Sequence, residues 1–186
     1  MKKFRLLFLM MALFPAIALV SCDDDDDGPP PTIRLKEQLI ANPWKCTEYN
    51  NNVKEILDTV TSIPAEKKQI IYGLLDIFPF QKDAIVEFKS DNKFYMGLAA
   101  VAAGDYSLSV NMLTVTFGDY GLANLIAISG EKLTMAVDKP SAIDLFVEIL
   151  GYEGDEAKAV KEALSAALDE LEFAMTFTKT SKDQPL

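Results

Sequence analysis

The side chains that most enzymes use for acid–base or metal chemistry are scarce in this chain. It contains no histidine, which excludes imidazole-based triads, general bases and zinc sites. The segment Gly118-Asp119-Tyr120-Gly121 has the composition of a turn and is no phosphate-binding loop. Asp91, Asp105 and Glu131 lie at expected strand ends, where carboxylates are usually solvated. We therefore predict no catalytic residue, metal site or cofactor, and no enzyme activity. Carboxylates that meet only in the folded chain cannot be recognised here, so a paired-carboxylate site stays open.

A run of five aspartates, Asp23 to Asp27, precedes Gly28 and has the spacing of the first half of an EF-hand loop. The twelfth position of such a loop requires a bidentate glutamate, and here it is Arg34. We reject calcium binding for this reason and because prolines 29–31 would prevent the loop from wrapping an ion. Like charges in a row repel one another, so residues 22–32 are expected to form an extended tether stiffened by the prolines.

Cys22 follows an N-terminal segment that is typical of secretion. A basic start is followed by an apolar run at residues 6–20, shorter than the roughly 20 residues of a membrane-spanning helix. This run ends in Leu19-Val20-Ser21-Cys22, which resembles the lipobox of bacterial lipoproteins. The resemblance implies that residues 1–21 are a signal peptide, cleaved between Ser21 and Cys22, and that the Cys22 thiol is acylated. The alternative is an ordinary cleavage site with a chance cysteine.

Acylation of Cys22 would leave Cys46 as the only cysteine, so no internal disulfide is expected. We expect Cys46 to pack as a small apolar side chain. Two or three acyl chains, at about 0.8 kcal/mol per buried CH₂, would hold the chain on a membrane.

The acidic residues directly after Cys22 resemble the surface-export signal of lipoproteins of the Bacteroidetes. The resemblance implies an outer-membrane protein that faces the cell surface, with a periplasm-facing protein as the alternative. Without residues 1–21 the chain keeps 15 Lys+Arg (18 − 3) against 28 Asp+Glu, a formal charge of −13. Such a chain should repel nucleic acid and anionic headgroups, so its membrane attachment is expected to come from the acyl chains.

Alternating apolar and polar residues predict strands through the middle of the chain. Residues 105–110, 113–117 and 132–138 alternate cleanly, which indicates one buried and one solvated face. Turn-forming residues separate six segments. We predict strands at 84–88, 94–102, 105–110, 113–117, 122–129 and 132–138, with a helix as the competing interpretation of 96–103. Two further strands are predicted at 44–49 and 173–179.

Helical spacing predicts the remaining elements. A short helix at 33–41, with Thr32 as its N-cap, precedes Trp44. Two helices are predicted within 53–79, and two more at 142–150 and 154–171.

This arrangement resembles the lipocalin-like lipoproteins of the Bacteroidetes, most of which have no assigned function. It implies a mainly β fold with added helices: an eight-stranded antiparallel up-and-down barrel with helical insertions after strand 1 and before the last strand. Trp44 would close one end of the barrel. The domain would span residues 33–180, followed by a tail at 181–186.

An eight-stranded barrel is wide enough either to be filled by its own side chains or to hold one small ligand. The candidate lining residues share the inward face of the predicted strands, and they are Phe88, Phe94, Met96, Tyr106, Phe117, Met135, Met175 and Phe177. The first functional hypothesis is binding of a small apolar, lipid-like ligand. The alternative is a cell-surface interaction or structural module with a filled core. The sequence leaves the ligand, protein partners and oligomeric state open.

The predicted strands 94–102 and 122–129 carry apolar residues on both faces. Ala99, Val101, Ala123, Leu125 and Ala127 fall on the outer face. A solvated face would carry charges, so we predict that a helical segment, for which the Ala-rich stretch 154–171 is suited, covers this outer wall.

Overall fold

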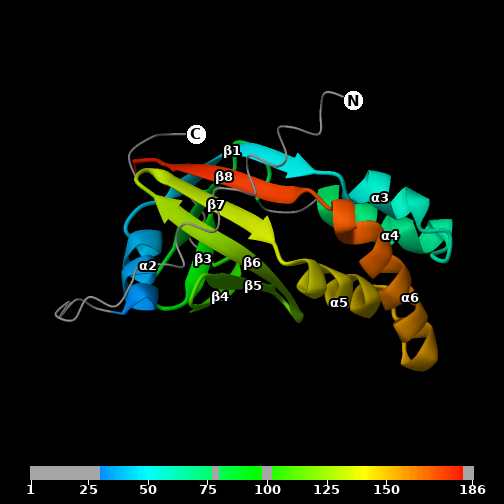
Figure 1. Ribbon diagram of the computed structural model, residues 1–186. Coiled ribbons are helices and arrows are strands. Elements are labelled where there is room, and N and C mark those ends of the chain that lie inside the picture. The colour runs from blue at the N-terminus through cyan, green and yellow to red at the C-terminus, as the bar shows by residue number, and fades with distance from the viewer. Residues whose placement is uncertain (1–29, 77–79, 98–101, 182–186) are drawn as a thin grey trace.

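The computed structural model describes residues 30–76, 80–97 and 102–181. Eight antiparallel strands close into one barrel in chain order, and the first strand pairs with the last (Figure 1). The strands are β1 (Trp44–Asn51), β2 (Ile85–Phe88), β3 (Lys93–Met96), β4 (Gly104–Ser109), β5 (Met112–Phe117), β6 (Tyr120–Ser129), β7 (Lys132–Val137) and β8 (Phe173–Lys179). The predicted eight-stranded up-and-down barrel is confirmed.

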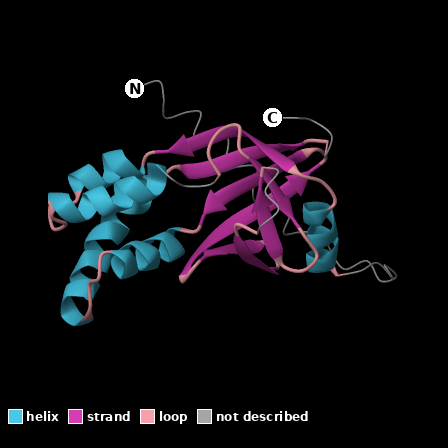
Figure 2. Ribbon diagram, turned by 180° about the vertical axis from the view of Figure 1, so that it is seen from behind, coloured by secondary structure: helices cyan, strands magenta, loops and turns pink. Residues whose placement is uncertain are grey.

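Helices cover the two ends of this barrel. They are α2 (Pro31–Ile40), α3 (Val53–Thr59), α4 (Ala65–Asp76), α5 (Lys139–Ile149) and α6 (Gly154–Ala167), the last continued by a 3₁₀ turn (Leu168–Glu170). The predicted insertions after β1 and before β8 are therefore also confirmed. Both ribbon views show α3 to α6 together at one end and α2 at the other (Figures 1 and 2). We call α3 to α6 the helical head.

Local sequence explains why these segments form a meander. In β5, Leu113 and Val115 are buried while Thr114 between them is not, the period of two that a one-sided sheet requires. Asn92 (φ 65°) and Gly130 (φ 59°) supply the positive φ needed in two of the hairpin turns. At the start of β4, a Cβ on Gly104 would lie 2.1 Å from the Thr116 carbonyl oxygen of β5. Only glycine allows the two backbones to approach this closely.

Several predicted boundaries are wrong. α5 begins at Lys139 and not at residue 142, and β6 begins at Tyr120 and not at residue 122. β3 ends at Met96 because Gly97 turns the chain with φ 59°, so the strand does not continue to residue 102. Ala99 and Val101 lie outside the described residues. The first helix begins at Pro31, with Pro30 as its N-cap residue, so Thr32 is not the cap. Proline suits this first helical position because its missing N–H has no helical partner there.

The prediction that a helix covers the outer wall is wrong for the described part of that wall, on β6. Ala123 and Leu125 do face outward, but Leu125 remains 36% exposed. α5 reaches only the Ala123 end, where the Ala123 N–H donates to Ser141 Oγ at 2.9 Å. α6 packs within the helical head, against α5 and α3, and buries Val160 and Leu164 there. An amphipathic helix needs an apolar surface, and its own neighbours supply one.

Candidate functional site

The predicted cavity-lining residues are brought together in the barrel interior. Six are buried, namely Phe88, Phe94, Tyr106, Met135, Met175 and Phe177, while Met96 and Phe117 are partly buried against the same core. The rings pack mostly edge to face, with centroid distances of 5.1 Å for Phe94–Phe117 and 5.2 Å for Phe88–Tyr106. These distances are those of a packed aromatic core.

Phe80 fills the space between these rings, and the sequence analysis missed it. This residue belongs to no strand and is fully buried. Its ring centroid lies 5.7 Å from that of Phe94, 6.1 Å from Phe117 and 6.2 Å from Phe177, so it contacts β3, β5 and β8 together. The available signal was the second aromatic residue of Phe78-Pro79-Phe80, directly ahead of the polar stretch Gln81 to Asp83.

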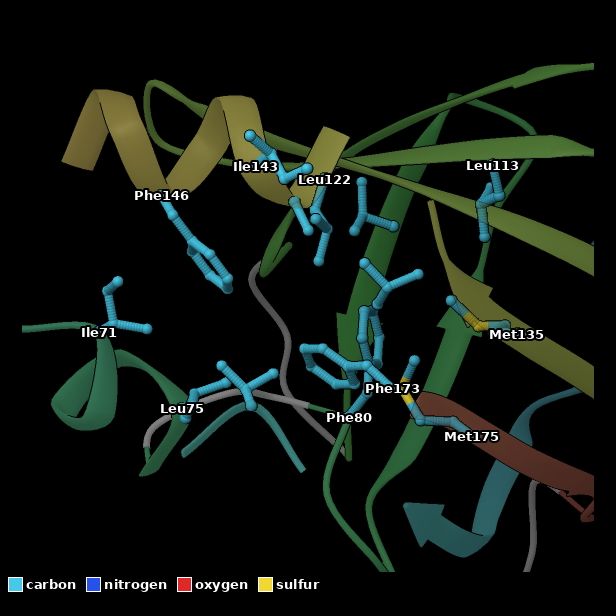
Figure 3. Close-up of a cluster of buried hydrophobic side chains, with 14 of the residues drawn as sticks. Ile71, Leu75, Phe80, Leu113, Leu122, Met135, Ile143, Phe146, Phe173 and Met175 are labelled. Carbon is cyan, nitrogen blue, oxygen red and sulfur yellow. The ribbon is translucent and has the colours of Figure 1, made fainter. Parts of the chain in front are cut away.

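Backbone and side-chain hydrogen bonds hold the segment that carries Phe80. The Gln81 amide nitrogen donates to the Asp76 carbonyl at 2.7 Å, and the Asp83 N–H donates to the Cys46 carbonyl at 2.9 Å. Figure 3 draws Phe80, Phe173 and Met175 in one cluster of buried apolar side chains with residues of α4 and α5. The core therefore runs without a break from the helical head into the barrel.

Asn124 is the polar side chain buried in the barrel wall, and it too was not singled out from the sequence. It is fully buried on β6. Its Nδ2 donates to the Leu122 carbonyl at 2.9 Å and approaches the Leu113 carbonyl at 3.4 Å. Its Oδ1 has no hydrogen-bond partner among the described groups. A single amide inside an apolar core offers no reaction chemistry.

Trp44 lies under α2 and closes the opposite end of the barrel. It is fully buried, and its indole Nε1 donates to the Leu39 carbonyl at 2.8 Å. Lys36 ties α2 to the β2–β3 turn by donating to Asn92 Oδ1 at 2.7 Å. This is the position that the lipocalin resemblance implied for the tryptophan.

Cys46 is confirmed as a free, buried cysteine. Its Sγ donates to the Glu48 carbonyl at 3.3 Å. Burial raises the pKa of the thiol to about 11, so it is protonated near neutral pH and a poor nucleophile.

The carboxylates singled out from the sequence are surface groups. Asp91, Asp105 and Glu131 are all exposed. Asp105 accepts a hydrogen bond from Lys93 Nζ at 2.9 Å across the β3–β4 pair. Within the described ranges, no group of three or more Cys, Asp or Glu side chains is placed to hold a metal ion.

A small apolar cavity lies where the helical head meets the barrel mouth. Its volume is about 60 Å³. Ile71 and Leu75 line it from α4, Phe146 from α5, and Leu122 and Val137 from the barrel. This cavity could not be recognised from the sequence because five separate elements, α4, α5, β6, β7 and β8, form it.

Ser21 and Cys22 lie outside the described residues. No helix in the described part of the chain combines the length and the apolar character needed to cross a membrane. Comparisons of the chain with protein-family models, with curated proteins and with solved structures found no significant match. The described architecture, a closed eight-stranded antiparallel barrel, is consistent with a lipocalin-like fold.

Proposed function

We propose that this chain is a lipid-anchored interaction module of the bacterial cell surface, in which a filled lipocalin-like barrel supports the helical head. One observation favours the interaction module over a barrel that binds a lipid: Phe80 occupies the interior between Phe94, Phe117 and Phe177. Sites for drug-sized ligands usually measure roughly 300–1,000 Å³. Rings whose centroids are about 6 Å apart leave no such space between them.

Anchoring through Cys22 would orient the module. Residues 22–30 span at most about 30 Å when fully extended, so the start of α2 would stay near the bilayer. The helical head lies at the other end of the barrel (Figure 1) and would point away from the membrane. The lipobox resemblance supports acylation, the acidic run after Cys22 supports export to the outer face, and the closed barrel with Trp44 beneath α2 supports a place among lipocalin-like lipoproteins.

Cell fractionation tests the anchor. The wild-type chain is expected in the outer-membrane fraction, and a Cys22→Ala variant in the soluble fraction. Cys46→Ala, which removes the other thiol, is the matched control and should stay with the membrane. A Cys22→Ala chain that still sediments with membranes would contradict the proposal, and full protection of the wild-type chain from protease added to intact cells would place it on the inner face.

Native mass spectrometry of protein purified from its own host tests the filled barrel. The expected mass is that of the acylated chain alone. A stoichiometric lipid that remains bound to the wild-type chain after detergent removal would instead favour the ligand-binding hypothesis.

A further inference from the structure

We infer that the groove between α4 and α5 is a docking site for the apolar face of a positively charged amphipathic segment of a partner protein. This inference deepens the proposed function and rests on it, since it names the surface and the kind of partner. Three features of the helical head carry it: an apolar cavity, an exposed apolar stripe beside the cavity, and a strong excess of negative charge.

The groove has an apolar floor and apolar sides. Leu74 on α4 and Leu145 and Ile149 on α5 form its sides, in addition to the deeper residues of the 60 Å³ cavity. Leu74 is exposed, and the two α5 residues are partly exposed. The cavity is therefore reached from the surface between the two helices, and its size suits one aliphatic side chain rather than a lipid.

α4 also presents apolar side chains to solvent beside the cavity. Ile70 is 49% exposed and Leu74 37% exposed. They are four residues apart, so they lie on one face of the helix. An exposed apolar stripe that continues into an apolar cavity is typical of a groove that receives an amphipathic helix.

The negative charge of the domain is concentrated in the helical head. Residues 53–76 and 138–172 carry 6 Lys and 14 Asp+Glu, which gives 6 − 14 = −8. The other described residues, 30–52, 80–97, 102–137 and 173–181, carry 8 Lys+Arg and 8 Asp+Glu, which gives zero. A partner segment with Lys or Arg beside its apolar face is therefore attracted to the head.

Neither lysine of α4 lines the cavity of the groove. Lys67 Nζ donates to the Leu150 carbonyl at 2.8 Å and lies 3.5 Å from the centroid of the Tyr152 ring. Lys68 is buried. Glu66, one turn before Ile70, and Glu148, next to Ile149, are exposed. Two copies of this head would repel each other, which favours a basic partner over self-association.

A synthetic peptide probes the groove directly. The probe is a fluorescent Leu/Lys amphipathic helix of about 14 residues, compared with a Leu/Glu peptide of the same apolar pattern. The protein is the complete mature chain carrying Cys22→Ser, so binding is measured without a membrane. We expect the Leu/Lys peptide to bind, the Leu/Glu peptide to bind at least about tenfold more weakly, and added salt to weaken the first complex.

Variants locate the binding. Ile70→Gln with Leu74→Gln is expected to weaken the Leu/Lys complex by about tenfold, and Glu66→Gln with Glu148→Gln by about threefold. Ile33→Gln, at an apolar residue of α2 that is 48% exposed, and Glu131→Gln on the barrel are matched controls that should leave affinity unchanged. All these positions are exposed, so the melting temperatures should stay close to that of the parent chain.

Equal loss of binding in the α4 variants and in Ile33→Gln would overturn the inference, as would equal binding of the two peptides. A wild-type dimer in analytical ultracentrifugation that Ile70→Gln with Leu74→Gln dissolves would also overturn it, because a second copy would then occupy the groove. Membrane fractionation and native mass spectrometry report separately on the proposed function, so the groove inference can fail while the anchored, filled module stands.

Discussion

Phe80 completes a core that is otherwise built by strands, although it lies between α4 and β2. Its ring contacts Phe94, Phe117 and Phe177 and is fully buried. We predict that Phe80→Ala lowers the free energy of unfolding by about 3–5 kcal/mol, because it removes a buried ring and leaves a cavity. Urea denaturation measures this loss. Phe80→Leu, which fills most of the volume, should cost clearly less.

The cavity of the Phe80→Ala variant has a second expected property. Benzene should raise the melting temperature of the variant and not that of the wild type, because dry apolar cavities of this kind bind apolar molecules. If Phe80→Ala lowered the free energy of unfolding by less than about 1 kcal/mol, the Phe80 ring would not be part of the core packing.

Val110 is strained at the tip of the β4–β5 hairpin. It has φ 56° and its side chain is 67% exposed. A β-branched residue in this region of φ is unfavourable, and almost no packing compensates for it here. We predict that Val110→Gly stabilises the fold by about 1 kcal/mol, which corresponds to a rise of roughly 2–4 °C in melting temperature.

Val110→Ala is the control for this change, because alanine keeps a Cβ and so relieves little of the strain. A lower melting temperature for Val110→Gly than for the wild type would show that the valine side chain contributes to stability in a way that its exposure does not suggest.

Cys46 should be unreactive toward thiol reagents in the folded chain. Burial raises its pKa from the ordinary 9.0 to about 11, so at pH 8 the thiolate fraction falls by about 100-fold. We expect Ellman's reagent to react with native Cys46 at least about 100-fold more slowly than with the chain in denaturant. A Ser107→Cys variant, with an exposed cysteine on β4, is the reactive control.

The raised pKa of Cys46 also gives stability a pH dependence with a definite sign. The unfolded thiol loses its proton near pH 9 and the folded thiol only near pH 11. The unfolded state is therefore favoured as pH rises through this window, and Cys46→Ala should flatten that part of the stability profile. A profile unchanged by Cys46→Ala would contradict this expectation.

At the scale of elements, α2 is fastened to the barrel by one buried hydrogen bond. Trp44 Nε1 donates to the Leu39 carbonyl. We predict that Trp44→Phe costs about 2–4 kcal/mol, because it leaves a buried carbonyl without its donor and reduces the ring volume. Far-UV circular dichroism in urea measures this cost. Lys36→Met removes the Lys36–Asn92 hydrogen bond, which is exposed, and should cost less than about 1 kcal/mol.

The strands and helices also show which predictions the alternation of apolar and polar residues in the sequence supports. Alternation placed Leu113 and Val115 inside and Leu125 outside, and the barrel agrees because strand side chains must alternate. The same pattern led to the prediction that a helical segment, for which the stretch 154–171 is suited, covers the outer face of β6, and this is wrong at Leu125. The hydrophobic effect has no direction, so the apolar stripe of a helix does not specify which apolar surface it buries against.

At the scale of the whole molecule, the helical head and the barrel share one core. Leu164 of α6, Phe80 and Trp44 belong to the same cluster of buried residues. We predict one cooperative unfolding transition, in which the fluorescence of Trp44, the only tryptophan, and the far-UV signal of the helices change together.

Leu164→Ala tests this coupling from the head. It removes a fully buried side chain, so the unfolding midpoints seen by Trp44 fluorescence and by the far-UV signal should both move to lower denaturant concentration by the same amount. Two separate transitions, with only the helical signal affected by Leu164→Ala, would show that the head unfolds independently of the barrel.

The sequence by itself determined the local features of this protein: the number and order of the strands, the faces of their side chains, the absence of histidine and a lipobox-like stretch that ends at Cys22. These follow from neighbouring residues, because pleating, turn conformation and short motifs are local. Only the tertiary structure decided that Phe80 occupies the barrel interior, that α6 packs on α3 and α5, and that α4 and α5 leave an apolar groove. Close packing joins residues far apart in the chain, and no local pattern records which of them will meet.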